Sequence, residues 1–66
     1  MKLTLNGKET AIEKSNNISE LINCYKLNPE NIVVELNEKI IKKTEWLNTS
    51  LKENDTIELI CFVGGG

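Results

Sequence analysis

Apolar and polar residues alternate at the start of the chain. Met1, Leu3 and Leu5 are apolar and the residues between them are polar, which is the period-two pattern of a half-buried strand. Asn6-Gly7 follows and is a strong hairpin signal, because both residues tolerate positive φ. The pattern therefore predicts a hairpin whose second strand runs through Ile12.

The apolar period changes to that of a helix after Asn16. Four apolar residues then stand at positions i, i+3, i+4 and i+7; they are Ile18, Leu21, Ile22 and Tyr25. Asn17 is a suitable N-cap, and Glu20 stands where the reaching-back residue of a capping box is found. We expect a helix over residues 18–26, which Pro29 cannot continue.

Two short strands follow the helix. Residues 32–36 read Ile-Val-Val-Glu-Leu, a composition favoured in strands, and Asn37-Glu38 is a turn into a strand over residues 39–41. The stretch 44–48 is too short for a full helix. We expect one helical or 3₁₀ turn there, which places Trp46 against the core.

A last strand is predicted over residues 56–63, after a turn at Asn54-Asp55. Alternate residues of a strand face opposite sides of its sheet. The side assigned to the core carries Ile57, Leu59 and Cys61, and the other side carries Glu58, Ile60 and Phe62. Exposed apolar residues often mark a binding surface, so Ile60 and Phe62 are a candidate partner interface. The alternative is that a loop or a neighbouring strand covers them.

The elements follow the order ββαβββ, which predicts an α+β fold. We expect a mixed five-stranded sheet packed on one helix, and a ubiquitin-like β-grasp matches this order best. Residues 1–63 would form a single domain, followed by a flexible glycine tail over residues 64–66. A chain of 66 residues is close to the lower size limit for one hydrophobic core.

Composition and charge narrow the class of partners. Charged residues make up 27% of the chain and the net charge is -2, so we expect no nucleic-acid surface, which would show clustered Lys and Arg. The longest apolar run, residues 59–63, is far shorter than the ~20 residues that span a bilayer. Residues 1–6 lack a signal-peptide core. We expect a soluble cytoplasmic protein without membrane contact.

The chain has two cysteines, Cys24 and Cys61, and no histidine. A tetrahedral zinc site needs four Cys or His ligands and an iron–sulfur cluster about four thiolates, so no metal site is predicted. Without histidine the usual general base for a Ser or Cys nucleophile is missing, and we expect no catalytic residue and no bound cofactor. We interpret both cysteines as buried free thiols, while a disulfide stays open.

Gly64, Gly65 and Gly66 close the sequence directly after the last predicted strand. Glycine lacks a side chain and adopts unusual backbone dihedrals, so this segment suits insertion into a narrow channel of another protein. Fully extended, residues 63–66 reach ~13 Å beyond the strand, enough to carry a terminal carboxyl into a partner's active site. The alternative is a frayed or engineered tail.

Several residues of the second half resemble one known family. They are Asn37, the pair Ile40-Ile41, Trp46, Asp55 and the closing glycines. With the opening hairpin, the short helix and the length, the chain resembles the ThiS family, the sulfur carrier proteins of thiamine biosynthesis. Many relatives have Gly-Asp where this chain has Asn54-Asp55, and often a proline where it has Lys42. Both departures bear on loop shape only.

The resemblance implies a protein co-substrate and not an enzyme. In the family, an activating enzyme related to ubiquitin-activating enzymes uses ATP to adenylate the terminal glycine carboxylate. The carboxylate is then converted to a thiocarboxylate with cysteine-derived sulfur, which the carrier hands to thiazole synthase. Carried over, the reacting group is the carboxylate of Gly66, with Gly65 as the second residue of the required pair. Ile60 and Phe62 would then dock on the activating enzyme and the synthase.

Three other interpretations of the sequence remain. The small subunit of molybdopterin synthase shares the chemistry, a ubiquitin-like protein modifier would join the activated glycine to lysines, and a non-reactive β-grasp interaction domain needs no chemistry. Trp46 is also a candidate interface anchor, although we expect it in the core. Lys39, Lys42 and Lys43 form a basic patch, which we interpret as a solvated surface.

Overall fold

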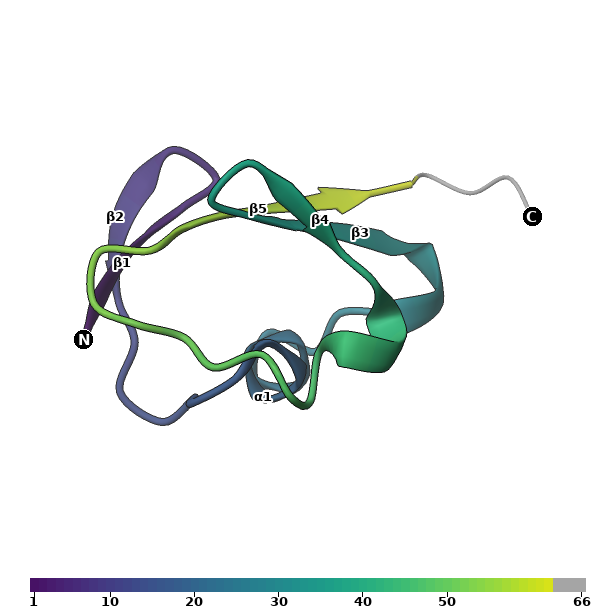
Figure 1. Cartoon of the computed structure of the whole chain (residues 1–66), viewed down its shortest axis with the longest axis horizontal. Coiled ribbons are helices and arrows are strands. Elements are labelled where there is room, and N and C mark those ends of the chain that lie inside the picture. The colour runs from purple at the N-terminus through teal and green to yellow at the C-terminus, as the bar shows by residue number, and fades with distance from the viewer. Residues whose placement is uncertain (63–66) are drawn as a thin grey trace.

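Figure 1 shows the computed structural model of the chain, which describes residues 1–62. The predicted order of strands and helix is confirmed. The strands are β1 (Lys2–Leu5), β2 (Lys8–Ala11), β3 (Ile32–Leu36), β4 (Lys39–Ile41) and β5 (Thr56–Cys61); the helices are α1 (Ile18–Cys24) and the 3₁₀ helices η1 (Pro29–Asn31) and η2 (Lys43–Glu45). Val63 and the predicted glycine tail, residues 64–66, lie outside the described residues.

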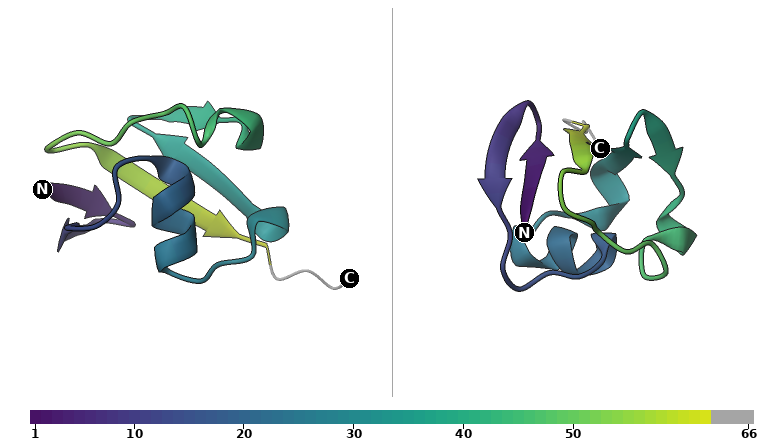
Figure 2. Two further views of the ribbon diagram at one scale, coloured as in Figure 1. Left: turned by 90° about the horizontal axis from the view of Figure 1, so that it is seen from below. Right: turned by 60° about the vertical axis from the view of Figure 1, so that its left-hand side comes forward.

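The strands form one mixed sheet in the order β2-β1-β5-β3-β4. β1 and β5 run parallel, whereas the hairpins β1–β2 and β3–β4 and the pair β3–β5 are antiparallel. α1 lies across one face of this sheet, below it in Figure 1 and in front of it on the left of Figure 2. Among residues 1–62, no helix covers the opposite face.

Both hairpins turn through residues with positive φ. Asn6 and Gly7 have φ values of 51° and 83°, and Asn37 and Glu38 have values of 51° and 72°. Positive φ at both central positions belongs to the type I′ turn, which suits the twist of paired strands. Both predicted turns are therefore confirmed. β2 ends at Ala11, so Ile12 lies just beyond the strand, where its side chain is still buried.

α1 begins where the sequence predicts, with one difference in its cap. Oδ1 of Asn17 accepts a hydrogen bond from the backbone N–H of Glu20 (2.8 Å). The Glu20 carboxylate reaches back to the N–H of Asn16 (2.7 Å), one residue before the partner it has in a capping box. The two bonds together fix the direction in which the chain enters the helix.

α1 ends two residues before the predicted boundary, because the chain closes it with a Schellman motif. The backbone N–H of Lys26 donates to the carbonyl of Asn23 (3.0 Å), and that of Leu27 donates to the carbonyl of Ile22 (3.2 Å). Lys26 takes a φ of 55°, a position that glycine more often fills. The helix thus stops at Cys24.

No helix within residues 1–62 is long and apolar enough to span a bilayer.

One hydrophobic core lies between the sheet and α1. Its buried members are Leu3, Leu5, Ile12, Ile18, Leu21, Ile22, Ile32, Val34, Trp46, Leu51, Ile57 and Leu59. Trp46 is 5% exposed, and its indole N–H donates to the carbonyl of Ile41 (3.0 Å), which confirms its predicted place. Tyr25 was expected on the buried stripe, but it is 42% exposed because α1 has already ended.

Candidate functional site

The candidate site is the sheet face opposite α1, which we call the outer face. Residues directly opposite each other in an antiparallel pair share a face. Val33 lies opposite Ile60, and Glu35 lies opposite both Ile40 and Glu58. By the same alternation along β5, Phe62 follows Ile60 on this side. The outer face therefore combines residues of β3, β4 and β5.

The apolar residues of the outer face are open to solvent. Ile60 is 44% exposed, Phe62 is 57% exposed and Ile40 is 69% exposed. The alternative that a loop or a neighbouring strand covers Ile60 and Phe62 is therefore wrong. Side chains of this size gain free energy when they leave water, at about 25 cal/mol per Å² of buried apolar area. The outer face is thus suited to contact with another protein, and the interface role of Ile60 and Phe62 stays a prediction.

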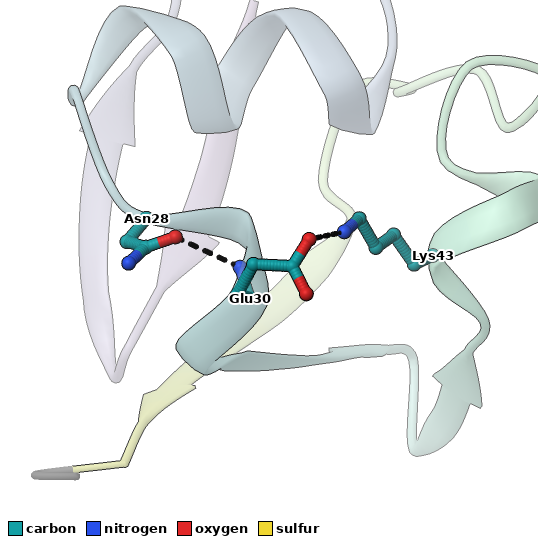
Figure 3. A network of polar contacts seen from close by, with 3 residues as sticks. All are labelled: Asn28, Glu30 and Lys43. Atoms are coloured by element: carbon teal, nitrogen blue, oxygen red, sulfur yellow. Dashed lines mark hydrogen bonds and ion pairs between the residues drawn. The ribbon is translucent and has the colours of Figure 1, made fainter. Parts of the chain in front are cut away.

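The end of β5 is held by the segment that precedes β3. The backbone N–H of Phe62 donates to the carbonyl of Asn31 (2.7 Å), so pairing with this segment extends one residue beyond β5. Asn31 belongs to η1, where Oδ1 of Asn28 accepts from the N–H of Glu30 (3.0 Å). The Glu30 carboxylate also pairs with the ammonium of Lys43 from η2 (Figure 3). These contacts fix the point at which the described chain leaves the sheet.

The predicted reacting residues are not among those described. Gly64, Gly65 and Gly66 lie outside residues 1–62, so their role rests on chemistry and comparison. Within residues 1–62, His, Cys, Asp and Glu form no group of three or more that could hold a metal ion.

The prediction that both cysteines are buried is wrong. Cys24 and Cys61 are free thiols and both are exposed. Cys24 lies in the last turn of α1, whose buried residues are Ile18, Leu21 and Ile22. Cys61 has the core-facing alternation predicted for it, but it is the last residue of β5 and lies two residues beyond Leu59, the last buried residue of that strand. Neither is packed in the core.

The predicted basic patch is a surface feature. Lys39 and Lys42 are exposed, and Lys43 forms the ion pair with Glu30. An exposed ion pair of this kind contributes little to stability, typically below about 1 kcal/mol. These three lysines thus form a solvated surface, as expected.

The sequence analysis missed two features of the outer face. Ile40 was noted only as part of a family motif, although one of the two residues in Ile40-Ile41 must face away from the core in a regular strand. The direct pairing of Glu35 with Glu58 has no local signal, because strand register depends on contacts between segments far apart in sequence.

The chain matches the ThiS family over residues 3–66. It is 38% identical over 65 residues to the sulfur carrier protein ThiS of Bacillus subtilis (strain 168), covering 97% of this chain and 98% of that protein. It is 29% identical over 66 residues to a thiazole synthase of Paramagnetospirillum magneticum, covering all of this chain and 20% of that protein.

A solved structure shares the whole fold. The crystal structure of the thiamine biosynthesis protein ThiS from Geobacter metallireducens superposes with a TM-score of 0.84 at 33% identity, and all of both chains is covered. The mixed five-stranded sheet with one helix is thus the β-grasp that the element order predicted. The chain belongs to the ThiS family of sulfur carrier proteins of thiamine biosynthesis.

Proposed function

We propose that the carboxylate of Gly66 is the group that carries sulfur. An adenylating enzyme related to ubiquitin-activating enzymes activates it with ATP, a system that draws sulfur from cysteine converts it to a thiocarboxylate, and thiazole synthase receives the sulfur. The observation that carries the proposal is family membership over residues 3–66, which includes the closing glycines. The exposed outer face, which includes Phe62 at the end of the described residues, supports it, because it provides a surface by which such enzymes can hold the carrier.

The proposed chemistry needs two substitutions at the Gly66 carboxyl group. A carboxylate oxygen attacks the α-phosphorus of ATP, so that an acyl-adenylate forms and pyrophosphate leaves. A sulfide-level sulfur nucleophile then attacks the carbonyl carbon, and AMP leaves with the oxygen while the thiocarboxylate remains. Both steps take place in the partner enzyme, since the carrier supplies only the acyl group. The chain itself therefore needs no catalytic residue and no bound cofactor.

Glycine suits this end of the chain for a steric reason. The reacting carbon of Gly66 carries no substituent beyond its two hydrogens, and Gly65 and Gly64 let a narrow channel close around the backbone. A side chain at Gly65 or Gly66 would collide with the walls of such a channel. The pair is thus part of the proposed reacting site, and Gly64 is part of the arm that delivers it.

Thiazole synthase is the acceptor that the comparisons favour. A stretch similar to this chain makes up 20% of a thiazole synthase in Paramagnetospirillum magneticum. A covalent link raises the effective concentration of two partners that must meet, so this arrangement supports a pairing of carrier and synthase. The proposal places the protein in the cytoplasm, where ATP and cysteine are available.

The test is reconstitution with the adenylating enzyme, ATP and a sulfur donor, followed by intact-mass spectrometry. Exchange of one terminal oxygen for sulfur raises the mass by about 16 Da, as atomic masses require. That species, and its loss on addition of thiazole synthase, supports the proposal. Adducts on lysines of other proteins would favour a protein modifier, and sulfur delivery only in a complex with the large subunit of molybdopterin synthase would favour the small-subunit alternative. An unchanged mass would favour the alternative that the chain is a non-reactive β-grasp interaction domain.

Deletion of Gly66 is the matched variant for this test. The remaining Gly64-Gly65 end still carries a carboxylate but stands ~3.3 Å short of the reacting position, so we expect adenylation, measured as ATP–pyrophosphate exchange, to be abolished. The melting temperature should change by less than about 2 °C, because the core lies within residues 3–59. A large fall in melting temperature would instead make the segment structural and contradict its role as a reagent.

A further inference from the structure

Two carboxylates face each other in the middle of the outer face. Glu35 on β3 lies directly opposite Glu58 on β5, which places their Cβ atoms about 5 Å apart. No lysine among residues 1–62 forms an ion pair with either of them. Like charges directly opposite each other destabilise a sheet, so this pair weakens the isolated domain.

Exposed apolar residues border the pair on two sides of the same face. Ile40 lies beside Glu35 on β4, and Ile60 and Phe62 follow Glu58 along β5. A patch with a polar centre and apolar neighbours fixes the orientation of a partner, because the partner has to satisfy the charges as well as cover the side chains. The carboxylates alone would be solvated surface, but three exposed apolar side chains lie on the same face, Ile40 beside Glu35 and the other two beyond Glu58 along β5.

The position of the patch indicates which partner it fits. Residues 63–66 span at most ~13 Å, so an enzyme that reacts with Gly66 must come close to Phe62. A second copy of this chain is a poor occupant, because a symmetric contact through the same face would bring four carboxylates together. The chain also carries a net charge of -2, which favours a basic partner surface.

We propose that the adenylating enzyme docks on the outer face with apolar contacts to Ile40, Ile60 and Phe62 and places an Arg or Lys side chain between Glu35 and Glu58. This inference rests on the proposed function, since it names how the activating enzyme recognises the carrier. The cation removes the repulsion between the two carboxylates. The pair that destabilises the free domain therefore stabilises the complex. An arginine suits two carboxylates best, because its planar guanidinium has five N–H donors.

The test compares three variants in ATP–pyrophosphate exchange with the purified adenylating enzyme. The double variant Glu35→Gln, Glu58→Gln removes both charges and keeps the shape. The double variant Glu13→Gln, Glu45→Gln is its control, because it changes the net charge equally at exposed positions outside the outer face. Glu58→Lys is the third variant, and it should stabilise the free domain by forming an attractive cross-strand pair with Glu35.

We expect the Glu35, Glu58 double variant to raise the KM for the carrier about tenfold with kcat unchanged, since a buried charge-assisted contact is lost. Its KM should also depend less on salt than that of the wild type. Glu58→Lys should raise the KM further while its melting temperature is equal to or above that of the wild type. Weaker binding of the carrier without any loss of stability separates recognition from folding.

Three results would count against the inference and one against the proposed function on which it rests. A KM of the Glu35, Glu58 variant within twofold of the control overturns the docked cation, and so does an unchanged KM for Glu58→Lys. Dimers of the wild-type carrier that Glu58→Lys abolishes would assign the face to a second copy. If the wild-type carrier supports no ATP–pyrophosphate exchange by the adenylating enzyme, the proposed function is refuted, and the inference that rests on it is refuted too.

Discussion

The side-chain amide of Asn37 donates a hydrogen bond to Oδ1 of Asp55 across 3.0 Å. Oδ1 of Asn37 accepts from the backbone N–H of Thr56 (2.9 Å), and Oδ2 of Asp55 accepts from the N–H of Lys52 (2.8 Å). Two residues of the family motif thus tie the turn between β3 and β4 to the start of β5. Their part in the motif is structural, since they bring together the strands that form the outer face.

Replacement of Asn37 by glycine tests this link. Glycine keeps the backbone at a φ of 51° and removes both side-chain hydrogen bonds, so we expect the free energy of unfolding to fall by about 2 kcal/mol. Asn54→Gly is the control, because Asn54 has a φ of 71° and its side chain makes no hydrogen bond within residues 1–62. Urea unfolding measures both, and equal stabilities would contradict the link.

The N-cap of α1 gives a second prediction. Asn17→Ala removes the bond to the N–H of Glu20, and we expect a loss of about 1 kcal/mol in the free energy of unfolding. Asn23→Ala, at an exposed position inside the same helix, should leave stability equal or higher, because alanine has the better helix propensity. Thermal unfolding followed by circular dichroism distinguishes the two variants. A loss of equal size in both would assign the effect to helix composition.

Trp46→Phe tests the polar contact of a core residue. Phenylalanine cannot donate to the carbonyl of Ile41 and leaves part of the indole volume empty, so we expect a loss of about 2 kcal/mol. Leu47→Ala, next in sequence but exposed, should change stability by less than about 0.5 kcal/mol. Circular dichroism in urea is the suitable measurement, because the variant lacks the tryptophan. A stable Trp46→Phe protein would show that the indole N–H contributes nothing.

Phe62→Asp separates docking from folding. Because Phe62 is 57% exposed, we expect the melting temperature to change by less than about 3 °C. The KM for the carrier in pyrophosphate exchange should rise at least about tenfold, since an aromatic anchor is replaced by a charge. Leu47→Asp, another exposed apolar residue but outside the outer face, should leave the KM unchanged. If Phe62→Asp unfolds the domain, the residue belongs to the core.

Local signals were sufficient for most of the fold. The turns at Asn6-Gly7 and Asn37-Glu38 need positive φ at both central residues, and asparagine and glycine tolerate it better than most. The strand boundaries of β3 and β4 were predicted to the residue. In each case the pattern that decides the structure lies within a few neighbouring residues, so the sequence displays it.

The predictions that failed depend on contacts from elsewhere. α1 ends early because Lys26 takes a positive φ and Leu27 closes the Schellman motif, although lysine carries no local signal for that conformation. Cys61 has the alternation of a core residue, but alternation does not tell how far along β5 the buried cluster reaches. Periodicity shows which side of a strand or helix faces the core, but it does not show at which residue the buried part ends.

The sequence by itself determined the order of the elements, both hairpin turns and the family, because each depends on local periodicity, turn chemistry or a motif that ends in Gly65-Gly66. Only the tertiary structure decided the outer face. Strand register brings Glu35 opposite Glu58, although the two glutamates are 23 positions apart along the chain. The register of β3 with β5 depends on which residues of each strand are buried against the other elements, and neither strand alone contains that information.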